Sequence, residues 1–200
     1  MRFQPRPKFG GAATVVFLVT GILAAGIPAS AQSAQNSRYA NKLAPSVFSP
    51  TRVVDLMLDL ANLKPNETLF DLGSGDGRIL IAAAGRYKAK AVGIEISPRL
   101  VAKANAAIRK QGLDGRAHVM EGDLLDSDLS GLANADVVTI YLATSLNEKL
   151  RPTLEKYLKP GARVISHDYA VRGWKPTRVE HTDDKHMHLV YLYEMPPLKN

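Results

Sequence analysis

The 200-residue chain contains no cysteine. This absence excludes a disulfide-based fold, thiolate zinc sites, iron–sulfur clusters and a cysteine nucleophile. Aromatic residues are also few, at 6%, but the hydrophobic content of 46% and the charged content of 22% are those of an ordinary globular protein. With roughly one domain expected per 150 residues, the length indicates one folded domain.

Acidic residues are missing from the N-terminal quarter of the chain, where the first acid is Asp55. Six basic residues precede it, whereas residues 55–200 hold 20 basic and 19 acidic residues and are nearly neutral. The formal net charge of +7 therefore comes mostly from the N-terminal stretch. A nucleic-acid-binding domain usually carries a basic patch, whereas this domain is nearly neutral. We therefore expect no nucleic acid among the partners.

Residues 1–31 have the order of a secretory signal peptide. Three basic residues come first, an apolar stretch runs from Ala12 to Ile27, and Ala29-Ser30-Ala31 forms a small-x-small cleavage site. We expect cleavage after Ala31, with a retained membrane anchor as the alternative. Both readings place the rest of the chain outside the cytoplasm, exported to the periplasm or anchored in the membrane. A cytoplasm-facing site stays open as a third arrangement.

A linker and a single α/β domain are expected after this leader. Residues 32–45 show no hydrophobic periodicity and are assigned to the linker, so the domain covers residues 46–200. Continuous apolar strands alternate with helices there, which favours a parallel sheet buried on both faces. The expected strands cover residues 68–72, 91–96, 117–121, 136–142 and 163–167, and the expected helices begin near Pro50, Ile79, Pro98 and Asn147.

Two further sequence features lie near the start and the end of this domain. Ser49-Pro50 is interpreted as a helix N-cap followed by Pro at the first helical position. Arg178–His181 and Met187–Glu194 are predicted to form an antiparallel hairpin at the edge of the sheet.

The most informative stretch is Asp71–Arg78, which reads Asp-Leu-Gly-Ser-Gly-Asp-Gly-Arg where the first strand ends and a helix begins. Glycines let the backbone turn tightly there and approach a ligand closely. Glu95 follows at the end of the next strand, where a carboxylate can accept hydrogen bonds from both ribose hydroxyls of a nucleoside. The loop and the acid together predict a nucleoside-containing cofactor.

The acidic residues of the loop indicate which nucleoside-containing cofactor it binds. Arg78 stands where the dinucleotide fingerprint has its third glycine, and Asp71 and Asp76 would repel a pyrophosphate by ~4 kcal/mol per close charge pair at an effective dielectric of 20. S-adenosylmethionine carries an ammonium and a sulfonium and no phosphate. We therefore predict S-adenosylmethionine, with dinucleotide binding by an oxidoreductase and a purely structural loop as the alternatives.

The D-x-G-x-G-x-G pattern of Asp71–Gly77 resembles the first motif of class I S-adenosylmethionine-dependent methyltransferases, and the resemblance covers roughly residues 46–195. It implies a Rossmann-like three-layer sandwich with a mostly parallel seven-stranded sheet and a C-terminal antiparallel hairpin. It also implies that Asp71 sits near the methionine amino group, that Glu95 holds the ribose hydroxyls, and that Ile96 and Asp123 meet the adenine.

The resemblance implies ten cofactor-binding residues: Asp71, Gly73, Ser74, Gly75, Asp76, Gly77, Glu95, Ile96, Asp123 and Leu124. Tyr141 ends the fourth strand, where the cofactor methyl faces the acceptor in that family, and is the candidate catalytic residue with a positioning role. A turn cap is the alternative role for Asp123, and core packing is the alternative for Tyr141.

A narrower resemblance concerns the ATP-synthase c-subunit lysine methyltransferase-like family and its small bacterial relatives. Ser49-Pro50, Asp71–Arg78, Arg163–His167 and Trp174-Lys175-Pro176 carry it, although that family usually has Thr-Pro where this chain has Ser49-Pro50. It implies a protein lysine as methyl acceptor. A small-molecule acceptor and a non-catalytic nucleoside-binding module are the alternatives, and we expect a monomer with a membrane contact through its N-terminus.

The sequence gives weaker indications of the residues around the methyl acceptor and of a role for the histidines. The candidate rim residues of the acceptor site are Thr144, Asn147, His167, Asp168 and Trp174. His186 and His188 share one face of the predicted last strand, but the sequence offers no third ligand beside them. We therefore expect no metal site.

Overall fold

The computed structural model describes residues 47–183 and 186–199. The predicted leader and the linker over residues 32–45 lie outside these ranges. Within them, no helix is both long and apolar enough to span a bilayer.

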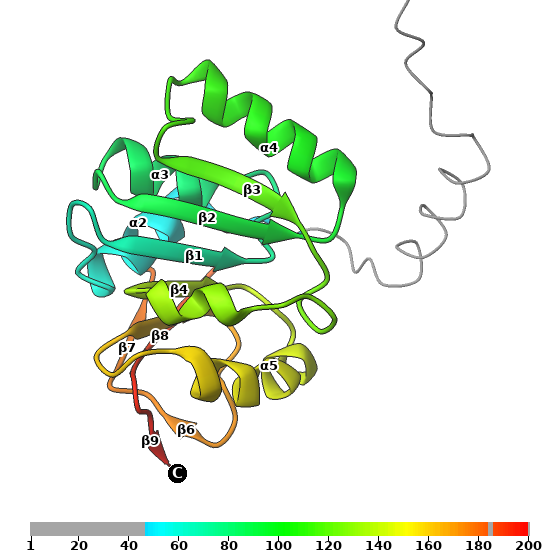
Figure 1. Ribbon diagram of the computed structural model, residues 1–200. Helices are drawn as coiled ribbons and strands as arrows, with labels where there is room; N and C mark the ends of the chain where they lie inside the picture. The colour runs from blue at the N-terminus through cyan, green and yellow to red at the C-terminus, as the bar shows by residue number, and fades with distance from the viewer. Residues whose placement is uncertain (1–46, 184–185, 200) are drawn as a thin grey trace, which may run out of the picture. The chain divides into compact units, whose positions relative to one another are not determined.

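One large sheet organises the domain (Figure 1). Its seven strands lie in the order β3-β2-β1-β4-β5-β8-β7, with parallel pairing from β3 to β5 and antiparallel pairing of β8 with both β5 and β7. The strands of this sheet are β1 (Thr68–Leu72), β2 (Lys90–Glu95), β3 (Ala117–Glu121), β4 (Val137–Ile140), β5 (Arg163–His167), β7 (Arg178–His181) and β8 (Leu189–Glu194). Two short strands, β6 (Trp174–Lys175) and β9 (Leu198–Lys199), form a separate pair near the C-terminus.

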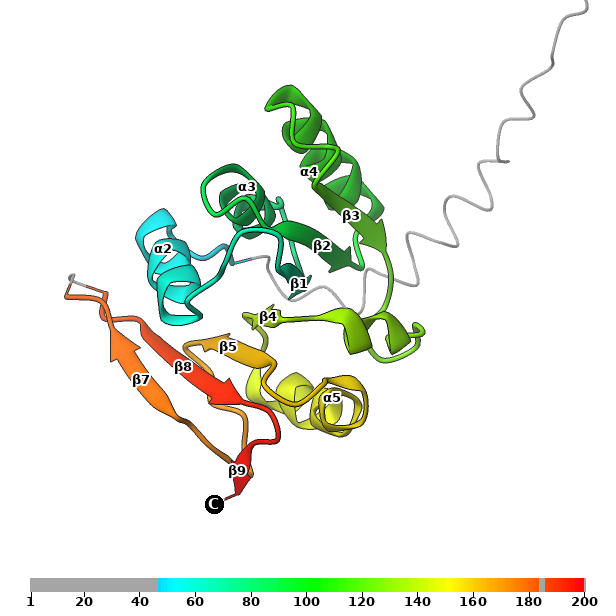
Figure 2. The same ribbon diagram turned by 60° about the vertical axis from the view of Figure 1, so that its left-hand side comes forward.

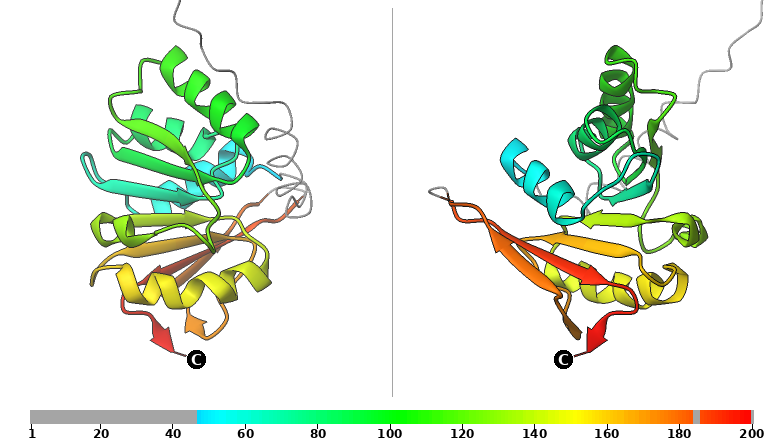
Figure 3. Two further views of the ribbon diagram at one scale, coloured as in Figure 1. Left: turned by 45° about the vertical axis from the view of Figure 1, so that its right-hand side comes forward. Right: turned by 90° about the vertical axis from the view of Figure 1, so that its left-hand side faces the viewer.

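Helices cover both faces of the sheet, as Figure 2 and the right-hand view of Figure 3 show. One face packs against α2 (Thr51–Leu60), α3 (Arg78–Gly85) and α4 (Pro98–Lys110), and the other against η1 (Ser130–Asn134) and α5 (Thr144–Tyr157). Successive residues of β1 alternate between the two cores: Leu69 joins the first and Phe70 the second. The predicted three-layer α/β sandwich with a C-terminal hairpin is confirmed.

The element bounds agree with the sequence in most places and differ in four, one of which is that α5 begins at Thr144 and not near Asn147. The strand predicted over residues 136–142 stops at Ile140, which leaves Tyr141 in the loop that follows it. The last strand begins at Leu189, so His186 and His188 precede it and do not share a strand face. The predicted N-cap is also wrong: no side chain caps α2, whose N-cap position is Pro50.

The predicted cap residue has a different partner. Ser49 Oγ lies 2.8 Å from His167 Nδ1, at the end of β5. Because that hydroxyl is engaged with the sheet, it is turned away from the first amides of α2.

Gly77 is a position where the fold depends on glycine. It caps α3 with a φ of +78°, and a Cβ there would lie 3.0 Å from Ala104 Cβ on α4. We expect Gly77→Ala to lower the free energy of unfolding by about 2–4 kcal/mol, through the left-handed backbone and the overpacked contact. Gly161→Ala is the matched control, because Gly161 has a φ of +80° and a Cβ there would meet no atom of the described residues within 4 Å. Urea denaturation that gave equal losses for both variants would contradict the packing role of Gly77.

Candidate active site

A pocket of about 480 Å³ opens at the carboxyl edge of the parallel strands. It lies beside the ends of β1, β2 and β4, where the strand order reverses between β1 and β4. Crevices at such switch points are the usual ligand sites of open α/β sheets. The residues predicted for the site that line this pocket are Asp71, Gly73, Ser74, Gly75, Asp76, Glu95, Ile96, Asp123, Leu124 and Tyr141.

Gly77 is the predicted cofactor residue that the pocket lining does not include. The chain has already turned into α3 at this point, and Gly77 packs against Ala104 of α4. Its position therefore supports the close approach of two helices, which differs from the ligand contact expected from the motif.

The glycine-rich loop is held by backbone bonds to β2. The amides of Gly73 and Ser74 both donate to the carbonyl of Ile94, at 2.8 and 3.1 Å. The amide of Gly75 donates to Glu95 Oε2 at 2.9 Å, and Gly73 and Gly75 both have positive φ, +85° and +54°. The loop is thus fixed as a concave backbone surface before any ligand arrives.

Ser74 fills a space that a small residue on the neighbouring strand leaves open. A Cβ at Gly93 would lie 2.5 Å from Ser74 Oγ, so the glycine on β2 is what admits the serine side chain. This Oγ is buried and makes no hydrogen bond to the described part of the chain. An unpaired buried hydroxyl is unusual in a native protein. Here it packs against Gly93 on β2 and helps to hold the loop against that strand.

Asp71 is the most strongly perturbed acid of the site. Thr139 stands directly opposite it on β4 and donates from Oγ1 to Asp71 Oδ1 at 2.7 Å. Burial raises the pKa of Asp71 from 3.8 to about 7, and the nearby carboxylates of Glu95 and Asp76 add to this effect. A buried carboxylate of this kind is ready to pair with a cation in the pocket.

Glu95 is oriented by two backbone amides at the end of β2. Its Oε2 accepts from Gly75 N–H and its Oε1 accepts from Ser97 N–H, both at 2.9 Å. A carboxylate has about four acceptor positions, so two such bonds fix the group and leave lone pairs for further donors. This arrangement fits the predicted role of Glu95 as an acceptor for two ribose hydroxyls.

Asp76 is paired differently from the sequence-based expectation. That expectation counted it as a second negative charge facing the cofactor, but Arg78 binds it with two bonds, Nε to Oδ1 at 2.9 Å and Nη2 to Oδ2 at 2.7 Å. The Arg78 hydrogen bond, which outweighs burial, lowers the pKa of Asp76. The cation-attracting charge of the site therefore rests mainly on Asp71 and Glu95.

Arg78 also holds the segment that precedes α2 against the pocket. Its Nη1 donates to the Ser49 carbonyl at 2.9 Å, and its guanidinium lies 4.9 Å from the centroid of the Phe48 ring. Phe48 lies so close to Gly75 that a Cβ there would meet its ring at 2.8 Å. The sequence did not predict this side of the pocket, because its residues are far from the loop along the chain.

Arg78→Met is expected to weaken S-adenosylmethionine binding by about 5- to 70-fold, because the segment bearing Phe48 loses a hydrogen bond worth about 0.5–1.5 kcal/mol and a cation–π contact worth about 0.5–1 kcal/mol. Isothermal titration calorimetry measures the change. Arg86→Met is the matched control: Arg86 also pairs with one acid, Asp55, but away from the pocket. Equal affinity of the Arg78 variant and the parent would contradict the role of this attachment.

Asp123 and Leu124 line the pocket from the segment after β3. Asp123 also caps a turn: its Oδ1 accepts from Leu125 N–H at 3.1 Å, and its carbonyl accepts from the amides of Asp126 and Ser127. The structural role and the pocket position are thus compatible, because the turn presents this side chain to the cavity.

Tyr141 lies just beyond β4 and lines the pocket. Its hydroxyl donates to Asp168 Oδ2 at 3.3 Å, and its ring centroid is 3.8 Å from that of His167. Burial, with the neighbouring Asp168, raises the pKa of Tyr141 to about 12. The phenol therefore stays protonated at neutral pH and can position a reactant but cannot act as a general base.

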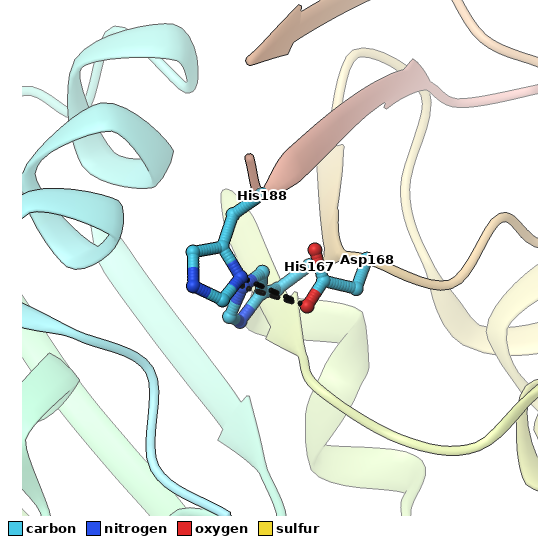
Figure 4. A group of neighbouring side chains, drawn as sticks. All are labelled: His167, Asp168 and His188. Carbon is cyan, nitrogen blue, oxygen red and sulfur yellow. Dashed lines mark hydrogen bonds and ion pairs between the residues drawn. The ribbon is translucent and has the colours of Figure 1, made fainter. Parts of the chain in front are cut away.

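His167, Asp168 and His188 form a compact cluster behind Tyr141 (Figure 4). His167 Nε2 lies 3.0 Å from His188 Nδ1 and 3.2 Å from Asp168 Oδ2, and His188 Nδ1 lies 3.0 Å from the same oxygen. The sequence placed the first two residues at the acceptor rim but did not bring His188 to them.

The other predicted rim residues lie elsewhere. Trp174 is 1% exposed and packs in the core against Tyr193, so its placement at the rim was wrong. Asn147 is fully buried and donates from Nδ2 to the carbonyl of Tyr169 at 3.2 Å. Thr144 begins α5, whose contribution to the pocket comes from Leu146 and Lys149.

These residues fit S-adenosylmethionine by their chemistry. Buried Asp71 offers a negative charge to an ammonium, and Glu95 offers acceptors to two hydroxyls. Ile96 and Leu124 supply apolar surface for a planar base. When bound, the cofactor supplies an activated methyl group.

A glycine loop flanked by acids at the switch point of this sheet defines a class I methyltransferase site, and comparison with known proteins agrees. The chain matches the family model for the ANTKMT methyltransferase domain over residues 71–178. It is 46% identical over 151 residues to a protein-lysine N-methyltransferase of Saccharolobus islandicus, covering 74% of this chain and 92% of that protein. The chain therefore belongs to the ANTKMT methyltransferase domain family and is an S-adenosylmethionine-dependent methyltransferase.

Two further proteins extend the comparison. An ATP synthase c-subunit lysine N-methyltransferase of Rattus norvegicus is 35% identical over 127 residues, covering 64% of this chain and 56% of the rat protein. The crystal structure of an RNA methyltransferase from Salinibacter ruber in complex with S-adenosyl-L-homocysteine has 44% identity and a TM-score of 0.69, and covers 74% of this chain and 94% of that one. The resemblance to the c-subunit lysine methyltransferase-like family is confirmed, as is the cofactor.

Proposed function

We propose that this methyltransferase acts on the side-chain amine of a protein lysine. The observation that carries the proposal is a pair of aromatic rings at the Tyr141 side of the pocket, where the family resemblance places the cofactor methyl. Tyr141 lines the pocket, and the ring of Tyr169 is stacked 6.1 Å away by centroid and is 42% exposed. An aromatic surface leading inward from solvent suits a long alkyl chain that ends in a cation.

Methyl transfer to an amine requires little acid–base catalysis from the protein. Transfer of a methyl group from a sulfonium to an amine is an in-line displacement, in which alignment of the two reactants alone can supply ~7–11 kcal/mol. The acceptor nitrogen must first lose a proton to water, since Tyr141 is protonated at neutral pH. Tyr141 then holds the uncharged amine in line. The named lysine methyltransferases among the relatives support this acceptor.

The acceptor class is tested by label transfer. The full-length protein is incubated with sub-saturating methyl-tritiated S-adenosylmethionine and a cell-envelope extract, with Asp71→Asn as the control of weakened cofactor binding. We expect labelled bands that protease removes and ribonuclease leaves, and methyl-lysine after acid hydrolysis. Label that ribonuclease removes would contradict the proposal in favour of RNA, the substrate class named for the Salinibacter relative. Label confined to small molecules would also contradict it.

We further propose that residues 1–31 carry the domain out of the cytoplasm or tether it to the membrane, and that the domain works as a monomer. The basic start, apolar stretch and small-x-small site of the sequence support this placement. A C-terminal fusion to alkaline phosphatase, which is active only outside the cytoplasm, tests it. We expect phosphatase activity in intact cells, whereas an inactive fusion would contradict export. Light scattering should give the mass of one chain.

A further inference from the structure

Three metal-ligand atoms converge beside the methyltransferase pocket, at the junction of β5 and β8. They are His167 Nε2, Asp168 Oδ2 and His188 Nδ1, separated by 3.0, 3.2 and 3.0 Å (Figure 4). Two imidazole nitrogens and one carboxylate oxygen are a frequent ligand set for divalent transition metals.

Two of these ligands are held by a second contact that leaves the converging atom available. Ser49 Oγ lies 2.8 Å from His167 Nδ1, which fixes the ring with Nε2 toward the cluster. The Leu189 amide donates to Asp168 Oδ1 at 3.0 Å and leaves Oδ2 facing the two rings. Outer contacts of this kind are what orient ligands in metal sites.

The backbone around the cluster is also constrained. Asp168 has a φ of +58°, although it is not glycine, and its amide donates to the Leu189 carbonyl at 2.7 Å. The His188 amide donates to Thr182 Oγ1 at 3.0 Å. Strained backbone held by several bonds is concentrated at functional sites, because the surrounding structure must maintain it against a cost of about 1–3 kcal/mol.

We propose that His167, Asp168 and His188 bind one divalent transition-metal ion, with Zn²⁺ as the best fit, and leave a fourth position open. Tetrahedral Zn²⁺ with bonds of ~2.0–2.1 Å places its ligand atoms about 3.3 Å apart. The observed separations need to open by only a few tenths of an ångström to reach that value.

A metal would use all three converging atoms, whereas hydrogen bonding leaves one imidazole hydrogen shared between two acceptors. Two ring nitrogens at 3.0 Å can share only one hydrogen, and Asp168 Oδ2 must also accept from the Tyr141 hydroxyl at 3.3 Å. A metal ion uses the lone pairs of all three ligand atoms at once. A purely hydrogen-bonded cluster is the competing outcome of the test.

The site is connected to the methyl-transfer pocket through two residues. Tyr141 lines the pocket and bonds Asp168, and Ser49 lines the pocket and contacts His167. Fixing Asp168 therefore fixes the Tyr141 hydroxyl. We expect removal of the metal to lower kcat by about 10-fold, as small misplacements at a reacting centre do, with little change in cofactor affinity.

Metal content of the tag-free, full-length protein tests the site. After dialysis against EDTA, the protein is titrated with Zn²⁺ and, separately, with Co²⁺ as a visible-absorption probe. We expect one equivalent of either ion in the parent and in the control His181→Asn, because His181 lies on β7 and is exposed. His188→Asn should bind neither ion. Absence of stoichiometric binding by the parent, or equal binding by His188→Asn, would overturn the proposal.

Two further readouts separate a metal site from a folding defect. Calorimetric S-adenosylmethionine binding should stay within about 3-fold of the parent in His188→Asn, since this residue lies outside the pocket lining. Zn²⁺ at about 100-fold over its Kd should raise the Tm of the parent by roughly 5–10 °C. If His188→Asn does not fold, an unchanged parent Tm still overturns the site. Failure of methyl transfer with intact metal binding would instead count against the proposed function.

Discussion

Asp71→Asn is expected to lower the affinity for S-adenosylmethionine by roughly 10- to 100-fold. Asp71 is 3% exposed and supplies a buried negative charge at the pocket. Hydrogen bonds to charged groups are worth about 1.5–3 kcal/mol, and each 1.4 kcal/mol corresponds to about a tenfold change in Kd. The isosteric amide keeps the shape of the side chain and can still bond Thr139, so the change isolates the charge.

The same carboxylate makes binding depend on pH. Because its pKa is about 7 in the empty pocket, Asp71 must lose a proton to pair with the cofactor ammonium below that pH. We expect the parent affinity to fall by up to about tenfold per unit as the pH drops below 7 and to level off just above it. Calorimetry from pH 5.5 to about 7.5, where the cofactor ammonium keeps its proton, measures this slope, which Asp71→Asn should remove.

The free energy of unfolding of the apo protein should change with pH in the opposite direction to the cofactor affinity. The unfolded chain releases the Asp71 proton near 3.8 and the folded chain keeps it to about 7. The folded state therefore binds more protons across that window, and the apo protein loses stability as the pH rises through it. Asp71→Asn should remove this loss.

Asp136→Asn is the control, because Asp136 precedes β4 at the opposite edge of the sheet and bonds the Thr68 amide. A flat affinity profile for the parent, or an equal loss of affinity in the control, would contradict the role of Asp71.

Tyr141→Ala is expected to reduce kcat by about 100-fold while the cofactor Kd changes by less than about 5-fold. Removing the ring leaves the acceptor amine without the surface that aligns it, and a 1 Å misplacement can cost about 100-fold in rate. The ring of Tyr169 would also lose its stacking partner 6.1 Å away. Steady-state kinetics with a lysine-containing acceptor give kcat and KM separately.

Tyr141→Phe separates the ring from the hydroxyl. It keeps the ring but loses the bond to Asp168, so we expect a kcat between those of the parent and Tyr141→Ala. Tyr87→Ala is the matched control, since the Tyr87 hydroxyl also bonds a carboxylate, Asp59, at 2.6 Å. A parent-like kcat in Tyr141→Ala would contradict the positioning role.

The sequence was sufficient for features that depend on neighbouring residues along the chain. The strands β1, β3 and β5 have the predicted bounds because each is a short stretch containing several apolar residues that stops where a turn begins. Asp71 and Glu95 fall into one pocket because parallel strands end at the same edge. β4 ended early because apolar Tyr141 and Leu142 leave the sheet to line the pocket, which an apolar pattern cannot distinguish from a buried strand.

Contacts between distant segments were not predictable from the sequence. Ser49 bonds His167 across 118 positions, and Arg78 bonds the Ser49 carbonyl across 29. His188 reaches His167 only because the antiparallel register pairs His167 with Val190. No local pattern encodes that register, so the third member of the histidine cluster was missed.

The most direct test identifies the atom that receives the methyl group. The full-length protein is incubated with ¹³C-methyl S-adenosylmethionine and an envelope extract, and the labelled products are digested and read by tandem mass spectrometry. We predict ¹³C-methyl on lysine Nζ, formed with S-adenosylhomocysteine and strongly reduced in Asp71→Asn at sub-saturating cofactor. A methyl group on a nucleobase or on a non-amine atom, or S-adenosylhomocysteine formed without any methylated lysine, would contradict the account.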